Sequence, residues 1–353
     1  MAATLGLFIQ LNMSSRVTQK IVALAAKVDP STVCLALNNS PNLPAGTRDR
    51  IIAIAAKLGY QRDPMLGALA AYRRGAAEPA FHGVLGWIVT SAGGYNWRLP
   101  PEYRDYHTGA IAAATQLGYQ LETLDLNDYS SNPKRLNGVL RARNIRGILV
   151  CPQPQAHTLL DLKIEDLSAV TFGYTVKSPQ LHMVSSHHYA AIRQTLGELR
   201  ARAYKRIGYA IPQSHNERLD HNYMAGYLLE QSQWPVDERL PPFVGEPRIG
   251  PFRSWLRAAR PDALVTTHYV FPEMVAALGI KAPDKLGLAI ISLADNVHAY
   301  AGIDEDSREV GRVAIGLLAS LVERGEKGLP ARPQRVLVRG IWREGQSLRA
   351  RPL

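Results

Sequence analysis

The chain has 353 residues, of which 46% are apolar and 20% charged, so it can bury a sizeable core and wholesale disorder is excluded. It carries 41 basic and 30 acidic residues, a formal net charge of +11, which favours polyanionic partners. Two cysteines, Cys34 and Cys151, argue against a disulfide scaffold. With no apolar run long enough to span a membrane, we expect a soluble, cytoplasmic protein of two or three domains.

The N-terminal segment, residues 1–15, is expected to be a disordered extension. It is mildly apolar, "MAATLGLFIQLN", but lacks the basic start and the small-residue cleavage site of an export signal. Translation could begin at Met1 or at Met13.

Basic residues are concentrated near the N-terminus. Residues 1–74 contain nine Lys or Arg and three Asp, a balance of +6, which leaves +5 for the rest of the chain. A uniform excess would indicate solubility alone. A small basic segment ahead of a less charged body indicates a nucleic-acid module.

Three short helical patterns follow the extension. Thr18 can cap a first helix over residues 19–27, and Asp29 with Pro30 can start a second over residues 30–38. A third begins at Thr47 and ends before Gly59, a natural residue just past a helix end.

The second helix has two unlike faces. Its inward face has Val33, Ala36 and Leu37, and its outward face has Ser31, Cys34, Leu35 and Asn38. Two short helices with a tight turn, braced by a third, predict a helix-turn-helix head. The alternative is a three-helix cap on a larger domain, which the basic excess disfavours.

The body alternates apolar runs with helical patterns, which predicts an α/β protein with parallel sheets covered by helices on both faces. About 270 residues suffice for two such sheets. The expected strands are residues 81–90, 120–126, 145–152, 167–174, 205–211, 261–267 and 286–293. The clearest helices are residues 106–119, 189–204, 224–233, 271–280 and 307–326.

The head resembles the DNA-binding head of the LacI/GalR family of bacterial repressors, without gaps over about fifty residues. The matching positions are Thr18, Ala23, Ala26, Val28, Ser31, Thr32, Val33, Asn38, Thr47, Arg48, Leu58, Gly59 and Tyr60. Departures are Lys27, where the turn usually has Gly or Asn, Asp29 in place of a capping Ser, and Cys34 in place of a Ser.

The resemblance implies a role for each matched position of the head. Pro30, Ser31 and Leu35 would face base edges, although a leucine offers only apolar contact, for instance to a thymine methyl. A hinge helix, "DPMLGALAAYRR", would follow the head and insert Leu69 into the minor groove. The residues that would approach phosphates are Thr18, Thr32, Cys34, Asn38, Thr47 and Tyr60.

The body resembles the type I periplasmic-binding-protein fold that forms the regulatory core of the same family. The most specific stretch runs from "AGIDEDSREVGRVAIGLLASLVERGE" to "GIWREGQSLR". The resemblance implies two lobes and three crossings between them, near Gly173–Gln180, Leu293–Ile303 and Arg332–Val338. The expected domains are a head at 16–62, a hinge helix and linker at 63–76, and a two-lobed effector-binding and dimerisation domain at 80–353.

A ligand cleft is expected at the carboxyl ends of the strands. An aromatic-rich lining suits a sugar face or a nucleobase, although each residue taken singly could equally be a surface or packing residue. Tyr223 stands where the family has an Arg, and His187 where it often has an Asp. The expected lining residues are Ser91, Trp97, Gln153, Tyr174, His187, Tyr223, His268, Tyr269 and Asp295.

Catalytic motifs are not found. The sequence has no Gly-x-Ser-x-Gly, no Gly-Lys-Ser/Thr phosphate loop and no His-Glu-x-x-His, and "GVLGWIVTSAGG" lacks the dinucleotide spacing. His182, His187 and His188 have no thiol or carboxylate at ligand spacing, so we expect no metal, and no cofactor or catalysis is predicted.

We therefore expect a sequence-specific transcriptional regulator, most simply a repressor. Its partners would be a pseudo-palindromic double-stranded DNA operator, a second copy in a homodimer, and a small-molecule effector. A sugar or a sugar derivative is the effector that best fits the expected cleft. The alternative is a solute-binding protein of the same fold, which needs an export signal and has no use for a basic head. Induction or corepression, and dimer or higher oligomer, stay open.

Overall fold

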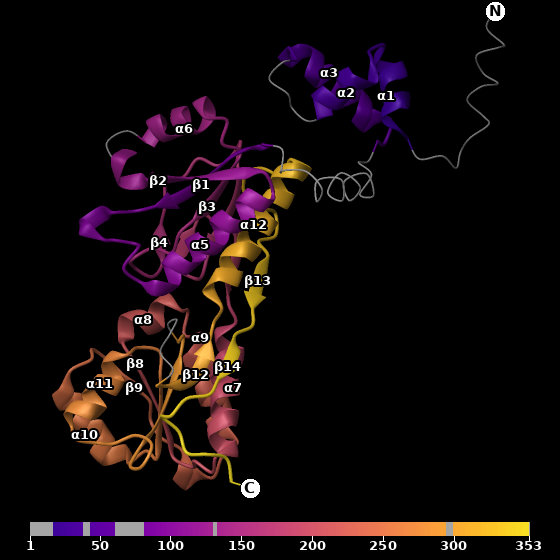
Figure 1. Ribbon diagram of the computed structural model, residues 1–353. Helices are drawn as coiled ribbons and strands as arrows, with labels where there is room; N and C mark the ends of the chain where they lie inside the picture. Colours follow the sequence, from indigo (N-terminus) through magenta and orange to yellow (C-terminus); the bar gives the residue numbers. More distant parts are fainter. Residues whose placement is uncertain (1–16, 38–42, 61–80, 130–132, 294–298, 353) are drawn as a thin grey trace, which may run out of the picture. The chain divides into compact units, whose positions relative to one another are not determined.

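The computed structural model describes residues 17–37, 43–60, 81–129, 133–293 and 299–352 (Figure 1). The chain divides into two units, Met1–Glu78 and Pro79–Leu353. The expected extension, the hinge helix with Leu69, and the candidate residues Asn38 and Asp295 lie outside the described residues.

The first unit is a small helical head with its own apolar core. Val22, Val33 and Ile51 are fully buried in it, one from each helix. The third helix begins at Ala45, two residues before the predicted Thr47, because it follows Pro44 directly and uses no polar cap that the sequence would reveal. The helices are α1 (Gln19–Ala26), α2 (Pro30–Leu37) and α3 (Ala45–Lys57).

The first lobe of the second unit is built on a wholly parallel sheet in the order β13-β7-β5-β3-β1-β2. Helices α5 (Pro101–Gln116) and α12 (Ser307–Arg324) cover one face, and α6 (Pro133–Ala142) packs on the other. The strands are β1 (Gly83–Val89), β2 (Tyr119–Asp125), β3 (Gly147–Val150), β5 (Ser168–Phe172), β7 (His182–Ser186) and β13 (Arg335–Val338).

The second lobe repeats this arrangement with the order β14-β12-β11-β10-β8-β9, in which only the β12–β14 pair is antiparallel among the described strands. Its strands are β8 (Ile207–Ile211), β9 (Phe243–Val244), β10 (Ala263–Thr266), β11 (Gly287–Ile291), β12 (Ala301–Asp304) and β14 (Ile341–Arg343). Its helices are α7 (His188–Ala201), α8 (Gln213–Arg218), α9 (Asn222–Ser232), α10 (Ile249–Ala259) and α11 (Val270–Ala277).

Each sheet of the second unit is buried on both faces, which explains its apolar strands. In the second lobe α7 and α9 pack on one face, and α10 and α11 on the other. Strands β4 (Thr158–Leu159) and β6 (Val176–Ser178) form a separate two-stranded parallel sheet. The predicted α/β class with two parallel sheets is confirmed.

The crossings between the lobes differ from the prediction. Gly173–Gln180 is not a crossing, because β7 follows it and still pairs in the first sheet; the chain leaves only at His187. The predicted second crossing at Leu293–Ile303 is also wrong, because β12 still pairs in the second sheet and the chain crosses only at Glu305. The third crossing falls between β13 and β14, just after the predicted Arg332–Val338. The polar residues of "HMVSS" concealed β7 as a buried strand.

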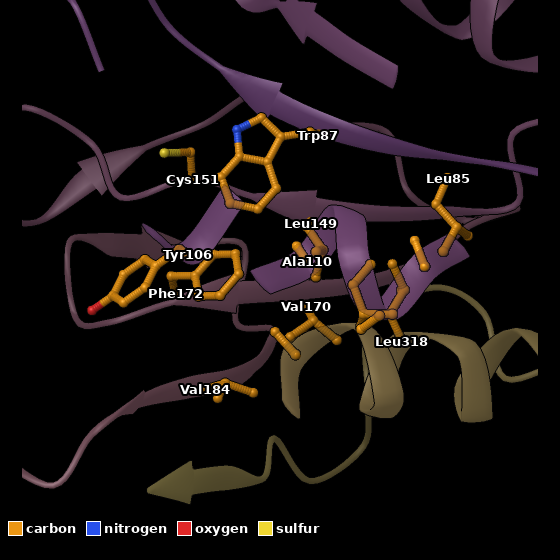
Figure 2. Close-up of a cluster of buried hydrophobic side chains, with 14 of the residues drawn as sticks. Leu85, Trp87, Tyr106, Ala110, Leu149, Cys151, Val170, Phe172, Val184 and Leu318 are labelled. Carbon is orange, nitrogen blue, oxygen red and sulfur yellow. The ribbon is translucent and has the colours of Figure 1, made fainter. Parts of the chain in front are cut away.

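An aromatic cluster fills the core between the first sheet and α5. Figure 2 shows Trp87 of β1 above the rings of Tyr106 and Phe172. The rings of Tyr106 and Phe172 are nearly parallel, with their centroids 5.1 Å apart. The centroid of the Trp87 ring lies 5.2 Å from that of Phe172. These rings fix one side of α5, whose first turns carry the residues of the cleft described below.

Helices α5 and α12 approach each other until their backbones touch. A Cβ placed on Gly109 of α5 would lie 1.9 Å from the carbonyl oxygen of Arg308, and one on Gly311 of α12 would lie 2.0 Å from that of Tyr106. Both contacts are with backbone, which cannot move aside as a side chain can. The crossing therefore requires glycine at both positions.

We expect Gly311→Ala to lower the free energy of unfolding by about 3 kcal/mol, because the added methyl group forces the two helices apart. Gly316→Ala in the same helix is the control: a Cβ there meets nothing within 4 Å, so it should stabilise by about 0.5–1 kcal/mol through the unfolded state. Urea denaturation measures both, and an equal effect of the two substitutions would contradict the close crossing.

Candidate nucleic-acid interface and ligand cleft

The turn between α1 and α2 sets where the second helix of the head begins. Lys27 closes α1 with a left-handed backbone, φ 52°. The Asp29 carboxylate then accepts a hydrogen bond from the Ser31 N–H at 2.8 Å, and its carbonyl accepts one from Thr32 at 2.9 Å. The bond from Ser31 lowers the pKa of Asp29 and keeps the cap ionised. A negative cap at a helix N-terminus is favourable.

The second helix presents its predicted outer face to solvent. Val33 and Ala36 are fully buried, whereas Ser31, Cys34 and Leu35 are exposed, Leu35 by 40%. Pro30 is also exposed, and Thr32 is half-buried. A short helix anchored by two apolar residues and exposing small polar groups has the shape that a major groove admits.

The other candidate DNA-contacting residues surround this helix in the sequence. Thr18 is exposed at the start of α1, where its side chain makes no capping bond, so its hydroxyl is available to a partner. Thr47 and Tyr60 are half-buried, and Tyr60 packs against the head's core. The Arg50 guanidinium donates to the Ala26 carbonyl at 3.0 Å, which ties α3 to the end of α1.

A cavity of about 60 Å³ lies between the two lobes of the second unit. The first lobe contributes the start of α5, and the second contributes α8 and the start of α9. The segments where the chain crosses between lobes add two buried groups, His188 and Glu305. The side chains that set its chemistry are Glu102, Tyr103, Tyr106, His215, Arg218 and Tyr223.

Two carboxyl groups share this cleft. The Tyr223 hydroxyl donates to Oε1 of Glu305 at 2.5 Å. Burial raises the pKa of Glu305, and burial also raises the pKa of Glu102, which the charge of Glu305 raises further. Removing the carboxyls from water thus favours their neutral forms.

Two histidines of the cleft are held neutral. His188 is 5% exposed, and its ring lies 4.8 Å from that of Tyr223. Its Nε2 is 3.7 Å from Oε1 of Glu305, yet burial lowers the pKa of His188 to about 3, so the imidazole is neutral and this contact is not an ion pair. Burial and the charge of Arg218 lower the pKa of His215 to about 3 as well.

Arg218 reaches from the second lobe to the first. Its guanidinium donates to the Tyr103 hydroxyl and lies 5.8 Å from the centroid of that ring. Its Nε is buried, and no group of the described residues accepts its hydrogen. The cleft therefore has a cation at its interlobe edge with unused donors.

Of the predicted cleft residues, Tyr174 and Tyr223 line this cavity. Trp97 lies instead in the aromatic core, 5.8 Å from Trp87. Gln153 is 1% exposed, and its amide donates to the Cys151 carbonyl at 2.7 Å. The other described candidates also lie outside the cavity lining.

These remaining candidates serve local structure. Ser91 follows β1, and its N–H donates to the Asp125 carboxylate at 3.0 Å. His187 caps α7 by accepting from the Ala190 N–H, and His268 accepts from the Val270 N–H in the same way. Tyr269 is half-buried against Tyr300, their rings 6.0 Å apart.

The sequence prediction missed the residues that come from helix starts. Eleven residues separate the end of β1 from the start of α5 at Pro101, so Glu102 and Tyr103 lie far in sequence from the strand end that they serve. Glu305 follows β12, a strand that the prediction did not include. The first turn of the helix that follows β1 would have identified Glu102, and the short connection between β12 and α12 would have identified Glu305.

Two further kinds of feature are absent from the described parts of the chain. No group of three His, Cys, Asp or Glu residues gathers there as a metal site. None of the described helices combines the length and apolarity that a membrane crossing requires.

The head and the two-lobed unit define a class of protein, a helix-turn-helix regulator with a periplasmic-binding-protein-like core. The family described as "Bacterial regulatory proteins, lacI family" matches residues 18–63. The match covers the three helices of the head and so assigns the head to that family of DNA-binding domains. No curated protein matches the chain in sequence.

Several solved structures share the fold. A complex of the transcriptional regulator CelR with cellobiose is 17% identical, has a TM-score of 0.54, and aligns over 94% of this chain and 100% of its own. A lac repressor dimer bound to operator and an anti-inducer is 15% identical, with a TM-score of 0.54 over 95% and 100%. CCPA from Weissella paramesenteroides, with bound glucose, is 13% identical, with a TM-score of 0.52 over 75% and 98%.

Lys27→Gly should stabilise the head by about 1 kcal/mol, because glycine adopts the left-handed conformation without the steric cost that lysine pays. Native-state hydrogen exchange at Val22 and Val33 in the full-length protein measures this. Lys27→Ala is the control, since it removes the same charge but keeps the strain; stabilisation by alanine would show that charge, and not backbone, is responsible.

His188→Gln should lessen the pH dependence of stability by the contribution of one histidine, while His215 keeps a similar contribution. The unfolded ring binds a proton near pH 6.5 and the folded one only near pH 3, so stability falls by about 1.4 kcal/mol per pH unit as pH drops through that range. Urea titrations between about pH 6 and pH 4 measure the slope. His157→Gln, at an exposed histidine, is the control and should keep the wild-type slope; an unchanged slope in His188→Gln would contradict a neutral His188.

Proposed function

We propose that the protein represses transcription by binding a pseudo-palindromic operator as a homodimer, and that a small molecule in the cleft sets its affinity for DNA. The observation that carries this proposal is the head: a separate unit with its own core whose second helix exposes Pro30, Ser31 and Leu35. A solute-binding protein of the same fold has no use for such a unit. The role is regulatory and not catalytic.

The proposed contacts with DNA are those that the resemblance of the head implies. Pro30, Ser31 and Leu35 read base edges, and Thr18, Thr32, Cys34, Thr47 and Tyr60 approach phosphates. Asn38 and Leu69, which lie outside the described residues, complete the set, with Leu69 inserted at the operator centre. Because its partner is chromosomal DNA, we place the protein in the cytoplasm.

The effector is a sugar or a sugar derivative. Three tyrosines of the cleft, Tyr103, Tyr106 and Tyr223, offer aromatic surface beside polar groups, which suits a ring with hydroxyl groups. The similar CelR and CCPA structures hold cellobiose and glucose, which supports the same class here. The effector can alter DNA binding only by favouring one arrangement of the lobes.

Selection of DNA fragments from a random pool by the full-length protein tests this function. We expect a two-fold symmetric site, and an affinity that falls steeply with salt because Lys and Arg displace condensed counterions. Leu35→Ala should weaken binding to the selected site without lowering thermal stability, since Leu35 is exposed. Equal affinity for all duplexes, or an affinity independent of salt, would overturn the proposal.

A further inference from the structure

We infer that the effector carries a carboxylate and that Arg218 binds it, so that this arginine selects acidic ligands over their neutral counterparts. The inference rests on the proposed function in one respect, that the interlobe cleft is the effector site. It goes further in naming the charged group of the ligand and the residue that recognises it.

Arg218 has hydrogen-bonding capacity that the described residues do not use. A guanidinium has five N–H donors in a planar fork. Here one donates to the Tyr103 hydroxyl, while the buried Nε has no acceptor among the described residues. A buried donor without a partner is costly, so this N–H favours an acceptor from outside the chain.

The positive charge of Arg218 has no ion-pair partner among the described residues. No carboxylate of the described residues lies within 4.0 Å of the Arg218 guanidinium, although arginines elsewhere in this chain, such as Arg202 and Arg193, have such partners. Glu102 and Glu305 do lie in the same cleft, but burial raises the pKa of each and favours the neutral acid. A neutral carboxyl does not compensate a guanidinium, and it adds an O–H donor.

Together these groups make the cleft rich in donors and poor in negative charge. Arg218 offers its fork, and burial disfavours negative charge on the carboxyls of Glu102 and Glu305. A carboxylate accepts two parallel N–H bonds from the fork of an arginine, which is the strongest arrangement available to either group. The ligand that satisfies this cleft therefore has an anionic oxygen pair facing Arg218.

A carboxylate fits better than a phosphate. The cavity is small, about 60 Å³, and a planar monoanion needs less room in it than a tetrahedral group. A phosphate with close to two negative charges would also lie beside Glu102 and Glu305 and be repelled by any ionised fraction of them. The tyrosine rings that line the rest of the cleft suit a hydroxylated carbon skeleton.

The experiment uses the full-length protein and paired ligands measured by calorimetry. D-Glucuronate is compared with D-glucose, and D-galacturonate with D-galactose; D-glucose 6-phosphate is the phosphate probe. We expect each acid to bind about 10- to 100-fold more tightly than its neutral counterpart, as for a hydrogen bond to a charged group. Arg218→Met should abolish that preference, and Arg218→Lys should restore part of it.

Arg253→Met is the matched control, because Arg253 is an exposed arginine of the same lobe and should leave the preference unchanged. If the Arg218→Met variant does not fold, the ratio of the affinities of the unaltered protein for the acidic and the neutral sugars tests the inference. Equal or tighter binding of the neutral sugars, tighter binding of the phosphate, or no binding of either acid would overturn the inference.

Operator affinity measured with the same ligands separates the two proposals. If a neutral sugar binds and changes operator affinity, the proposed function stands and the carboxylate inference fails. If an acid binds through Arg218 without changing operator affinity, the inference stands and the proposed effector role fails.

Discussion

The contact of the α5 and α12 backbones at Gly109 and Gly311 is the constraint on which the cleft depends. Because α5 carries Glu102, Tyr103 and Tyr106, and because Glu305 stands two residues before α12, both elements must keep their spacing for the four side chains to meet. The Arg308 guanidinium adds a hydrogen bond to the Asp105 carboxylate at 3.2 Å beside the same crossing. Because Gly109 and Gly311 have no side chains, α5 and α12 can pack closely enough to form one wall of the ligand site.

The three crossings between the lobes come together at this wall. The His187 N–H donates to the Val338 carbonyl at 2.7 Å, which joins the first crossing to the third, and His188 contacts Glu305 at the second. The floor of the cleft is therefore made of the same segments that must bend when the lobes move. A ligand that contacts these segments can favour one lobe arrangement over another, which is what regulation requires.

Local chemistry made the head predictable from the sequence. The Asp29 cap, the Pro30 start and the buried pair Val33 and Ala36 depend on neighbours a few residues away, and they lie as predicted. Long-range packing decided the rest. β7 is buried despite His182, Ser185 and Ser186, because other parts of the lobe cover both faces of its sheet, so the sequence concealed it and misplaced the first crossing.

The same reason limits what could be predicted of the cleft. Trp97 follows a strand end, as a ligand-binding residue should, but the rings of Trp87 and His107 take it into the core. Glu102 and Arg218 line the cleft because the start of a helix in one lobe faces a helix in the other. The spacing of residues along the sequence does not predict that these two helices lie close together. Sequence patterns find groups near a strand end, whereas the fold decides which of them point inward.

The position of the guanidinium has a consequence for how binding and lobe movement are coupled. Where the family usually has an arginine, this chain has Tyr223, whose hydroxyl is committed to Glu305 on the cleft floor. The positive charge comes instead from Arg218 on α8, and its partner, Tyr103, belongs to the opposite lobe. A cation on the floor would hold a ligand equally in open and closed arrangements. A cation at the edge gains its full set of acceptors only when the lobes are close, so an anion bound there stabilises the closed arrangement selectively.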